Sequence, residues 1–214
     1  KKPAEELFDL RKDRDEVRNL ASSPAHQDVL RRFRQANQTH LKGIRDIGLL
    51  PENEIHTRDH KQVPVERVLA AAELASSLKP EALPQLEAAL QDSDSAVRYW
   101  AAMGWLMREK PAPLKVLEDP APAVRIAAAE SIGRYGRPED LAPAMKELLN
   151  LANAAEHGAY VAMLSLNALD ALGAKVKPWR DAILALPDQD ARAPERVRTE
   201  YLKRLLERLR VTLG

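Results

Sequence analysis

The chain has 214 residues, 45% of them hydrophobic and 4% aromatic, and its formal net charge is +1 at pH 7. This charge balance argues against a strongly basic nucleic-acid-binding protein and against an acidic disordered tail, so we expect no nucleic-acid partner. No apolar run approaches the roughly 20 residues that a membrane-spanning helix needs, so we expect no membrane partner. Cysteine is absent, which excludes disulfides, thiol catalysis, zinc–cysteine sites and iron–sulfur clusters within this chain.

Residue usage favours helices over strands. The sequence contains 34 Ala and 31 Leu against 12 Val and 6 Ile, with only 8 Gly. Alanine and leucine are strong helix formers, whereas the β-branched residues that favour sheets are scarce. The composition therefore predicts an α-rich protein.

The first 62 residues differ in pattern from the rest of the chain. Residues 6–10 (Glu-Leu-Phe-Asp-Leu) alternate polar and apolar side chains, which predicts a short strand. Ser23-Pro24 has the sequence of a helix N-cap followed by a first-turn proline. The helix that follows is expected to carry one stripe formed by Leu30, Phe33, Asn37, Leu41 and Ile44. Residues 48–61 are polar and predict an exposed connection.

From Val63 onward the sequence repeats itself. A basic residue followed by proline recurs at spacings of 31, 27 and 40 residues, within the range of helical-hairpin arrays. Proline is tolerated in the first helical turn, where its missing N–H would be unpaired anyway, so each pair predicts a helix start. The four pairs are Lys79-Pro80, Lys110-Pro111, Arg137-Pro138 and Lys177-Pro178.

Two units correspond more closely. Residues 92–102 parallel residues 119–129 at an offset of 27, each with an acidic turn, then Val-Arg, then paired alanines. This pattern resembles the second-helix signature of HEAT-type repeats. Aspartate with serine or proline can end one helix and cap the next, and small alanines allow close helix packing. We expect Arg98 to reach back to Asp92 of its own turn, and Arg125 to reach back to Asp119.

The remaining units are less regular. Residues 138–173 form a degenerate unit without the Val-Arg pair, and residues 64–78 predict a single helix for the first unit. A terminal capping helix over residues 194–211 is expected to bury one stripe made of Val197, Tyr201, Leu205 and Leu209. The sequence thus predicts an all-α protein in which residues 63–214 form an α-α superhelix of HEAT-like helical hairpins.

The opening segment resembles the C-terminal tail of type I sulfatases. Residues 3–21 read Pro-Ala-Glu-Glu-Leu-Phe-Asp-Leu-Arg-Lys-Asp-Arg-Asp-Glu-Val-Arg-Asn-Leu-Ala, and residues 45–52 read Arg-Asp-Ile-Gly-Leu-Leu-Pro-Glu. Residues 200–206 also resemble the end of sulfatases that carry helical repeats. The close match covers residues 3 to about 60, which we assign as a tail of strand, helix and linker (residues 1–62).

In that family, the Leu-aromatic-Asp-Leu segment is the last strand of a small antiparallel sheet on the catalytic domain. Residues 7–10 have no sheet partners here, so we expect them to be disordered, to lie against the helices, or to pair with a second copy. The chain begins with Lys1 rather than methionine, and we expect it to be a piece of a longer protein.

The resemblance implies a parent enzyme that removes sulfate from sulfated carbohydrate, using a formylglycine and a calcium ion. Formylglycine forms from cysteine or serine in a motif of that residue, any residue, proline, any residue and arginine. The nearest match, residues 22–26 (Ser-Ser-Pro-Ala-His), ends in histidine and is explained by helix capping. No carboxylate cluster has calcium-loop spacing. We therefore expect this chain to be non-catalytic, with no cofactor and no metal of its own.

Other candidate residues have structural alternatives. His56 and His60 flank Asp59 at a spacing that could share a metal ion, but an exposed loop is the expected reading. Arg98 and Arg125 could bind sulfate oxygens, although their recurrence favours structural ion pairs. An interaction surface is expected over Tyr99, Trp100, Met103 and Met107 together with these two arginines, with ordinary packing between repeats as the alternative. Basic residues also cluster at Arg31, Arg32, Arg34 and at Arg196, Arg198, Lys203, Arg204, Arg208 and Arg210.

Three functions remain open. The chain could be an accessory region of a sulfatase whose repeats shape the substrate entrance or hold domains or subunits together. It could be an autonomous HEAT-like protein-binding scaffold, or a module that binds sulfated glycan through its basic faces. The resemblance favours the first, with a sulfatase catalytic domain of the same polypeptide or of a second subunit as partner. It also favours a periplasmic or secreted location.

Overall fold

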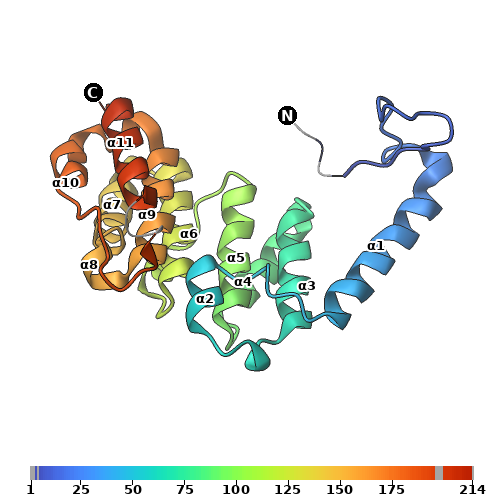
Figure 1. Ribbon diagram of the computed structural model, residues 1–214, viewed down its shortest axis with the longest axis horizontal. Coiled ribbons are helices and arrows are strands. Elements are labelled where there is room, and N and C mark those ends of the chain that lie inside the picture. Colours follow the sequence, from blue (N-terminus) through green and yellow to red (C-terminus); the bar gives the residue numbers. More distant parts are fainter. Residues whose placement is uncertain (1–2, 4, 196–199, 214) are drawn as a thin grey trace. The chain divides into compact units, whose positions relative to one another are not determined.

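The computed structural model describes residues 3, 5–195 and 200–213, which form helices, turns and loops but no strand (Figure 1). The predicted all-α class is confirmed for these residues. The α helices are α1 (Gln27–Gly43), α2 (Glu52–Thr57), α3 (Val65–Ser76), α4 (Leu83–Ala89), α5 (Ser95–Met107), α6 (Pro122–Tyr135), α7 (Leu141–Leu151), α8 (Ala154–His157), α9 (Ala159–Leu172), α10 (Arg180–Leu184) and α11 (Leu202–Leu213). The 3-10 helices are η1 (Pro24–His26), η2 (His60–Gln62), η3 (Pro80–Ala82), η4 (Leu114–Glu118), η5 (Pro138–Asp140) and η6 (Gly173–Trp179).

The chain divides into two compact units, Lys1–Asp46 and Ile47–Gly214. The division expected after residue 62 separates a sulfatase-like tail from a repeat region, and it stays a prediction about sequence relationship. The short helix α2 belongs to the second compact unit, although its residues lie in the expected tail.

In the first unit, the strand expected over residues 6–10 is not formed. The Leu20 backbone N–H donates to the Leu7 carbonyl at 2.7 Å. The Asn19 side chain makes two further hydrogen bonds to this segment. Its Oδ1 accepts from the Leu7 N–H at 3.0 Å, and its Nδ2 donates to the Glu5 carbonyl at 3.0 Å. A side chain thus takes the place of a partner strand, so two chain segments lie side by side without a β ladder.

Helix α1 buries little of its predicted stripe. Leu30 is buried, but Phe33 is 55% exposed and Ile44 is 57% exposed. An ion pair between Arg34 and Glu5 links the helix to the opening segment. The first unit therefore holds α1 mainly through polar contacts.

In the second unit, successive helices pack on one another. Helix α5 packs against α3 and α6, α6 packs against α7 and α9, and α11 packs on α9 (Figure 1). Most of their facing residues form a continuous aliphatic core from Leu90 to Leu213, whereas α3 packs on α5 through a smaller cluster that includes Val65, Val68 and Val97. Two glycines allow helices to approach closely, α5 to α4 at Gly104 and α6 to α9 at Gly133. A Cβ on Gly104 would lie 2.7 Å from Leu86, and one on Gly133 would lie 2.6 Å from Leu172.

The basic-proline pairs have two different roles. Pro80 and Pro138 begin the short helices η3 and η5, which lead into α4 and α7 as predicted. Pro111 precedes η4 by three residues and Pro178 lies inside η6, so these two predicted helix starts are wrong. The first two pairs also mark helix ends, as the residue before each pair has a positive φ angle. These residues are Leu78, with φ 55°, and Glu109, with φ 57°.

Helix α11 buries a stripe that shares only Leu209 with the predicted one, among the residues that the structure describes. Its buried residues are Leu202, Leu206, Leu209 and Leu213. Tyr201 is exposed, Leu205 is half-buried, and Val197 lies outside the described residues. A strict spacing of four residues drifts around a helix of 3.6 residues per turn, whereas alternating spacings of four and three keep one face.

Candidate functional site

Residues 47–62, here called the crossing segment, make several polar contacts with the helices of the second unit. The sequence predicted an exposed connection over residues 48–61, and this prediction is only partly right. Leu50, Pro51, Asn53 and Glu54 are buried, whereas the exposed residues are Gly48, Glu52, His56, Thr57, Asp59 and Lys61. The segment contains α2, and both Asn53 and Glu54 are buried. Hydrogen bonds and an aromatic contact to α5 and α9 hold it in place, and these long-range contacts leave no periodic signal in the sequence.

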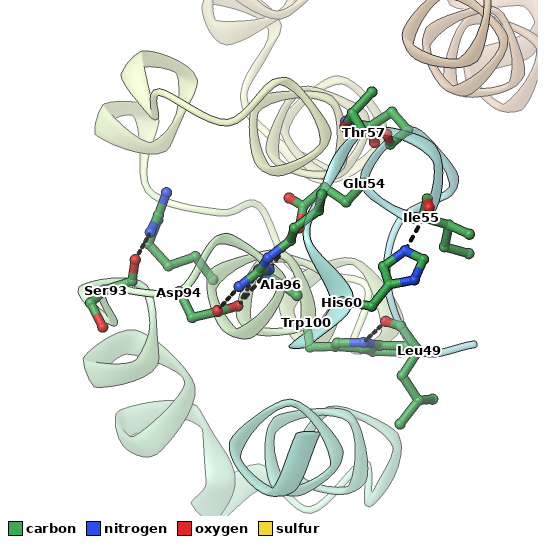
Figure 2. Close-up of polar contacts among 12 residues, drawn as sticks. Leu49, Glu54, Ile55, Thr57, His60, Ser93, Asp94, Ala96 and Trp100 are labelled. Atoms are coloured by element: carbon green, nitrogen blue, oxygen red, sulfur yellow. Dashed lines mark hydrogen bonds and ion pairs between the residues drawn. The ribbon is translucent and has the colours of Figure 1, made fainter. Parts of the chain in front are cut away.

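Arg58 joins the crossing segment to the start of α5. Its guanidinium donates to Glu54 at 3.0 Å and forms a two-pronged ion pair with Asp94 (Figure 2). Asp94 also caps α5, because its Oδ1 accepts from the Ala96 N–H at 3.0 Å. Burial alone would raise the pKa of Asp94, but the hydrogen bonds and charge of Arg58 outweigh it, and the pKa lies below 3.8.

Further contacts attach the start of the crossing segment to α5, close its later turn internally and join α2 to α9. The Trp100 indole N–H donates to the Leu49 carbonyl at 2.7 Å, and the His60 ring contacts the Ile55 carbonyl at 2.7 Å (Figure 2). His56 stacks on Tyr160 of α9, with ring centroids 4.1 Å apart and an interplanar angle of 19°. The crossing segment therefore contacts α5 through one set of residues and α9 through another.

A cavity of about 660 Å³ lies between the crossing segment, the starts of α5, α6 and α9, and residues 190–194. Its wall carries four charged side chains and a mostly apolar remainder. The lining residues are Asn53, Glu54, Thr57, Arg58, Ser95, Pro122, His157, Gly158, Ala159, Tyr160, Val161, Asp190, Arg192, Ala193 and Pro194. The buried Oδ1 of Asn53 has no hydrogen-bond partner in the described part of the chain.

The second pair of charges in this wall is Asp190 and Arg192. Asp190 caps α9 by accepting from the Ala159 N–H at 2.9 Å, and Arg192 Nε donates to the same carboxylate at 2.9 Å. Arg192 also donates to the Ala154 carbonyl at 3.1 Å. Burial would raise the pKa of Asp190, but Arg192 and the two backbone N–H groups lower it below 3.8. The carboxylates of Asp94 and Asp190 are thus both held ionised.

The sequence predicted that Arg98 and Arg125 pair with the aspartates of their own turns. This prediction is wrong. Arg98 donates to both carboxylate oxygens of Asp119, at 2.7 and 2.9 Å, and Arg125 pairs with Glu147 at 3.0 Å. Each arginine thus reaches forward into the next helical pair. The prediction failed because Asp119 becomes a neighbour of Arg98 only when α5 packs beside the turn before α6. The 27-residue offset between the two sequence segments does not indicate this contact. Arg98 touches its own turn through two backbone carbonyls, those of Asp92 at 2.9 Å and Ser93 at 3.3 Å.

The predicted interaction surface on α5 is divided among several environments. Tyr99 and Met103 are half-buried against the main core, and burial raises the pKa of Tyr99. Trp100 faces the crossing segment. Met107 is exposed and lines a smaller cavity of about 300 Å³ with Leu78 and Leu83. An interaction role for these residues stays a prediction.

The histidines and basic clusters are also spread apart. His56 is exposed as expected, but it lies in α2 and not in a loop, and its ring stacks on Tyr160 of α9. No group of three or more potential metal-binding side chains occurs among the described residues. In the basic clusters, Arg31 pairs with Asp28 and Arg208 with Asp170, while Arg196 and Arg198 lie outside the described residues.

The first unit has its own polar cavity, of about 530 Å³, lined partly by Asp9, Asp13 and Asn19. Ser23 begins η1 there, but its side chain makes no capping hydrogen bond to the backbone. Its Oγ instead contacts the His26 Nδ1 at 2.9 Å. The expected capping role of this serine is therefore wrong in detail, although its position at the helix start is as predicted.

Comparison with known proteins gives one partial similarity. The chain is 43% identical over 54 residues to an ulvan-active sulfatase of Formosa agariphila. The aligned stretch is 25% of this chain and spans only 9% of the length of that relative. No protein-family model matches the chain. Among the described helices, none has the length and apolar character to cross a membrane.

Proposed function

We propose that this chain is a non-catalytic, helical accessory region of a sulfatase that acts on sulfated carbohydrate. The observation that carries the proposal is the 43% identity over 54 residues to an ulvan-active sulfatase. The aligned length is close to that of residues 3–60, where the motifs typical of a sulfatase tail occur. The chain has no cysteine, and its Ser-Ser-Pro-Ala-His segment lacks the final arginine of the formylglycine motif.

The second unit is proposed to be an α-α superhelix of HEAT-like hairpins. Supporting this, α5 and α6 begin at the two sequence segments related by an offset of 27 residues. Arg98 and Arg125 hold equivalent positions in them, and both pair with a carboxylate in the following helical pair. The repeats would shape a substrate entrance or hold a domain or subunit in place.

The proposed partner is a sulfatase catalytic domain, either in the same polypeptide or in a second subunit. Calcium and formylglycine would belong to that domain, and a periplasmic or secreted location would follow from the relationship. The exposed Phe33 and Ile44 of α1 are consistent with a first unit that packs on another domain, because large apolar patches commonly mark contact surfaces.

The coding region upstream of the Lys1 codon provides the test. We expect the same reading frame to encode a Cys/Ser-x-Pro-x-Arg motif some hundreds of residues earlier, or a neighbouring gene to encode it. Purified chain of this length should release no sulfate from an aryl sulfate. An upstream region and neighbouring genes without a sulfatase motif would contradict the proposal, as would sulfate release by the purified chain.

A further inference from the structure

The wall of the cavity beside the crossing segment carries equal numbers of positive and negative side chains, so its net charge is zero. Glu54 and Asp190 contribute two negative charges, and Arg58 and Arg192 contribute two positive charges. Each guanidinium already donates to a carboxylate, at 3.0 Å for Arg58 and Glu54 and at 2.9 Å for Arg192 and Asp190. A charged ligand would have to break one of these pairs, which is unfavourable for partly buried ions.

We infer that this cavity binds an uncharged sugar residue of an oligosaccharide. A sugar hydroxyl both donates and accepts hydrogen bonds, so it can add to a paired carboxylate or guanidinium without separating the pair. The choice of a saccharide over other neutral polar ligands rests on the proposed function, since the similar sulfatase is named for activity on ulvan.

The polar groups of the wall are held in place before any ligand arrives. Asp190 is fixed by the Ala159 N–H at 2.9 Å, and Thr57 is fixed by the Asn53 carbonyl at 2.7 Å. Arg58 is fixed by the Asp94 carboxylate at the start of α5. Such preorganisation reduces the ordering cost of binding.

Asn53 provides the second observation that points to a ligand. Its buried Oδ1 has no hydrogen-bond donor among the described residues, and its residue lines the cavity. An unsatisfied buried acceptor costs about 1–3 kcal/mol. This oxygen has almost no accessible surface, so a ligand hydroxyl can donate to it only after the Asn53 side chain turns toward the cavity. That hydrogen bond would remove the cost, and a purely apolar ligand would not.

The remaining wall suits the C–H faces of a sugar ring. Pro122, Val161, Ala193 and Pro194 contribute apolar atoms, and Tyr160 adds an aromatic side chain. The volume of about 660 Å³ lies within the roughly 300–1,000 Å³ of typical small-ligand sites. The cavity therefore has room for more than one sugar unit.

The test uses the 214-residue chain and a panel of neutral oligosaccharides, each paired with its sulfated counterpart. Binding is followed by amide chemical shifts and by calorimetry at low and high NaCl. We expect at least one neutral oligosaccharide to bind, to shift the amides of Ala159 and Tyr160, and to keep its affinity at high salt. Salt-insensitive binding is expected because no ion pair forms with the ligand.

Two variants separate this site from nonspecific binding. Asn53→Leu removes the unsatisfied acceptor and should weaken binding at least tenfold. Arg192→Ala should also weaken binding; because it leaves the nearly buried Asp190 carboxylate without its cation, circular dichroism first checks that the variant keeps its helical content. Arg180→Ala, an exposed arginine outside the cavity, is the matched control and should leave binding unchanged.

Several outcomes would overturn the inference. They are binding by no panel member, binding only by sulfated members that is lost at high salt, and shifts confined to residues outside the cavity. Binding of apolar or acidic peptides in place of sugars would also overturn it. If the chain binds a neutral sugar but neither its upstream region nor a neighbouring gene encodes a sulfatase motif, the binding site is supported and the proposed function is refuted.

Discussion

Arg98 and Asp119 form a two-pronged ion pair across the packing between α5 and the turn before α6, with donor–acceptor distances of 2.7 and 2.9 Å. The two side chains are only 12% and 9% exposed. Asp119 also accepts from the Ala121 N–H at 2.8 Å, so one carboxylate both caps a helix and joins two helical pairs. The contact therefore couples the stability of neighbouring helical pairs.

Removing one partner of this pair should destabilise the second unit strongly. We expect Arg98→Ala to lower the free energy of unfolding by about 2–4 kcal/mol, because the Asp119 carboxylate is left nearly buried without its cation. Arg98→Lys should also be destabilising, since an ammonium cannot reproduce the two-pronged geometry. Urea unfolding followed by circular dichroism measures both effects.

The control for this prediction is the exposed pair of Arg180 and Asp181. Arg180→Ala should change the free energy of unfolding by less than about 0.5 kcal/mol, as is usual for surface ion pairs. Equal losses for Arg98→Ala and Arg180→Ala would show that burial of the first pair does not matter.

Two tryptophans on α5 allow a matched test of the crossing segment. The Trp100 N–H donates to the Leu49 carbonyl, whereas the buried Trp105 N–H has no partner among the described residues. Trp100→Phe should therefore cost about 1–2 kcal/mol more than Trp105→Phe, because only the first substitution removes a hydrogen bond. Thermal unfolding measures the difference, and proteolysis near Arg58 should increase only in Trp100→Phe.

A larger loss for Trp105→Phe than for Trp100→Phe would contradict this account. Such a result would mean that the volume removed from the core outweighs the lost hydrogen bond. Both substitutions remove the same atoms, so that contribution is approximately matched.

Glu109 lies two residues after the last residue of α5 and has a φ angle of 57°, a conformation that favours glycine. Glu109→Gly should raise the free energy of unfolding by about 1 kcal/mol, because a side chain is disfavoured in this region. For a chain of this size, that gain corresponds to a rise in melting temperature of about 2–4 °C. Differential scanning calorimetry measures the shift.

Glu109→Ala is the control for this substitution, as it removes the carboxylate but keeps the Cβ atom. It should give no increase in melting temperature. A rise that is equal in both variants would assign the effect to the lost charge instead of the backbone.

Glu130 should make the protein less stable as the pH rises. Burial raises the pKa of Glu130 above 4.5, and the hydrogen bond from Arg134 only partly offsets this. The folded state therefore binds this proton more tightly than the unfolded state, and the stability from this group is lost as pH rises from 4.5 through the raised pKa. Glu130→Gln should be more stable than the parent at pH 7 and equal to it well below pH 4.5.

Asp94 should show the opposite behaviour. Its pKa is below 3.8 in the folded state, so its stabilising contribution is present above pH 3.8 and is lost as the pH falls through the lowered value. Asp94→Asn should be less stable than the parent at pH 7, and the difference should shrink in acid. Unfolding curves recorded from pH 2 to 8 compare both variants, and a Glu130→Gln difference of the Asp94→Asn sign would contradict the assignment.

Local sequence signals predicted the helical class and many of the helices of this protein. The apolar pattern after Pro64 locates α3, and the repeated acidic turns locate the starts of α5 and α6. These features depend on residues within one or two turns, which a linear pattern contains. Helix-end residues such as Leu78 were missed, because a positive φ without glycine leaves no compositional signal.

The candidate site could not be predicted in the same way. Its wall combines Glu54, Tyr160 and Asp190, which are far apart in the sequence and meet only after the helices pack. A polar stretch such as residues 48–61 looks like an exposed loop until the charges across from it are known. The partner of Arg98 was likewise decided by packing and not by proximity along the chain.

The stacking of His56 on Tyr160 has a consequence for how the second unit loses its structure. A linear array whose members touch only their neighbours can fray from either terminus, one member at a time. Here the stacking joins α2 to α9, so α2 cannot detach without losing a contact to a helix much later in the chain. Truncating the protein before Tyr160 would thus remove a contact that holds α2, more than a hundred residues away in the sequence.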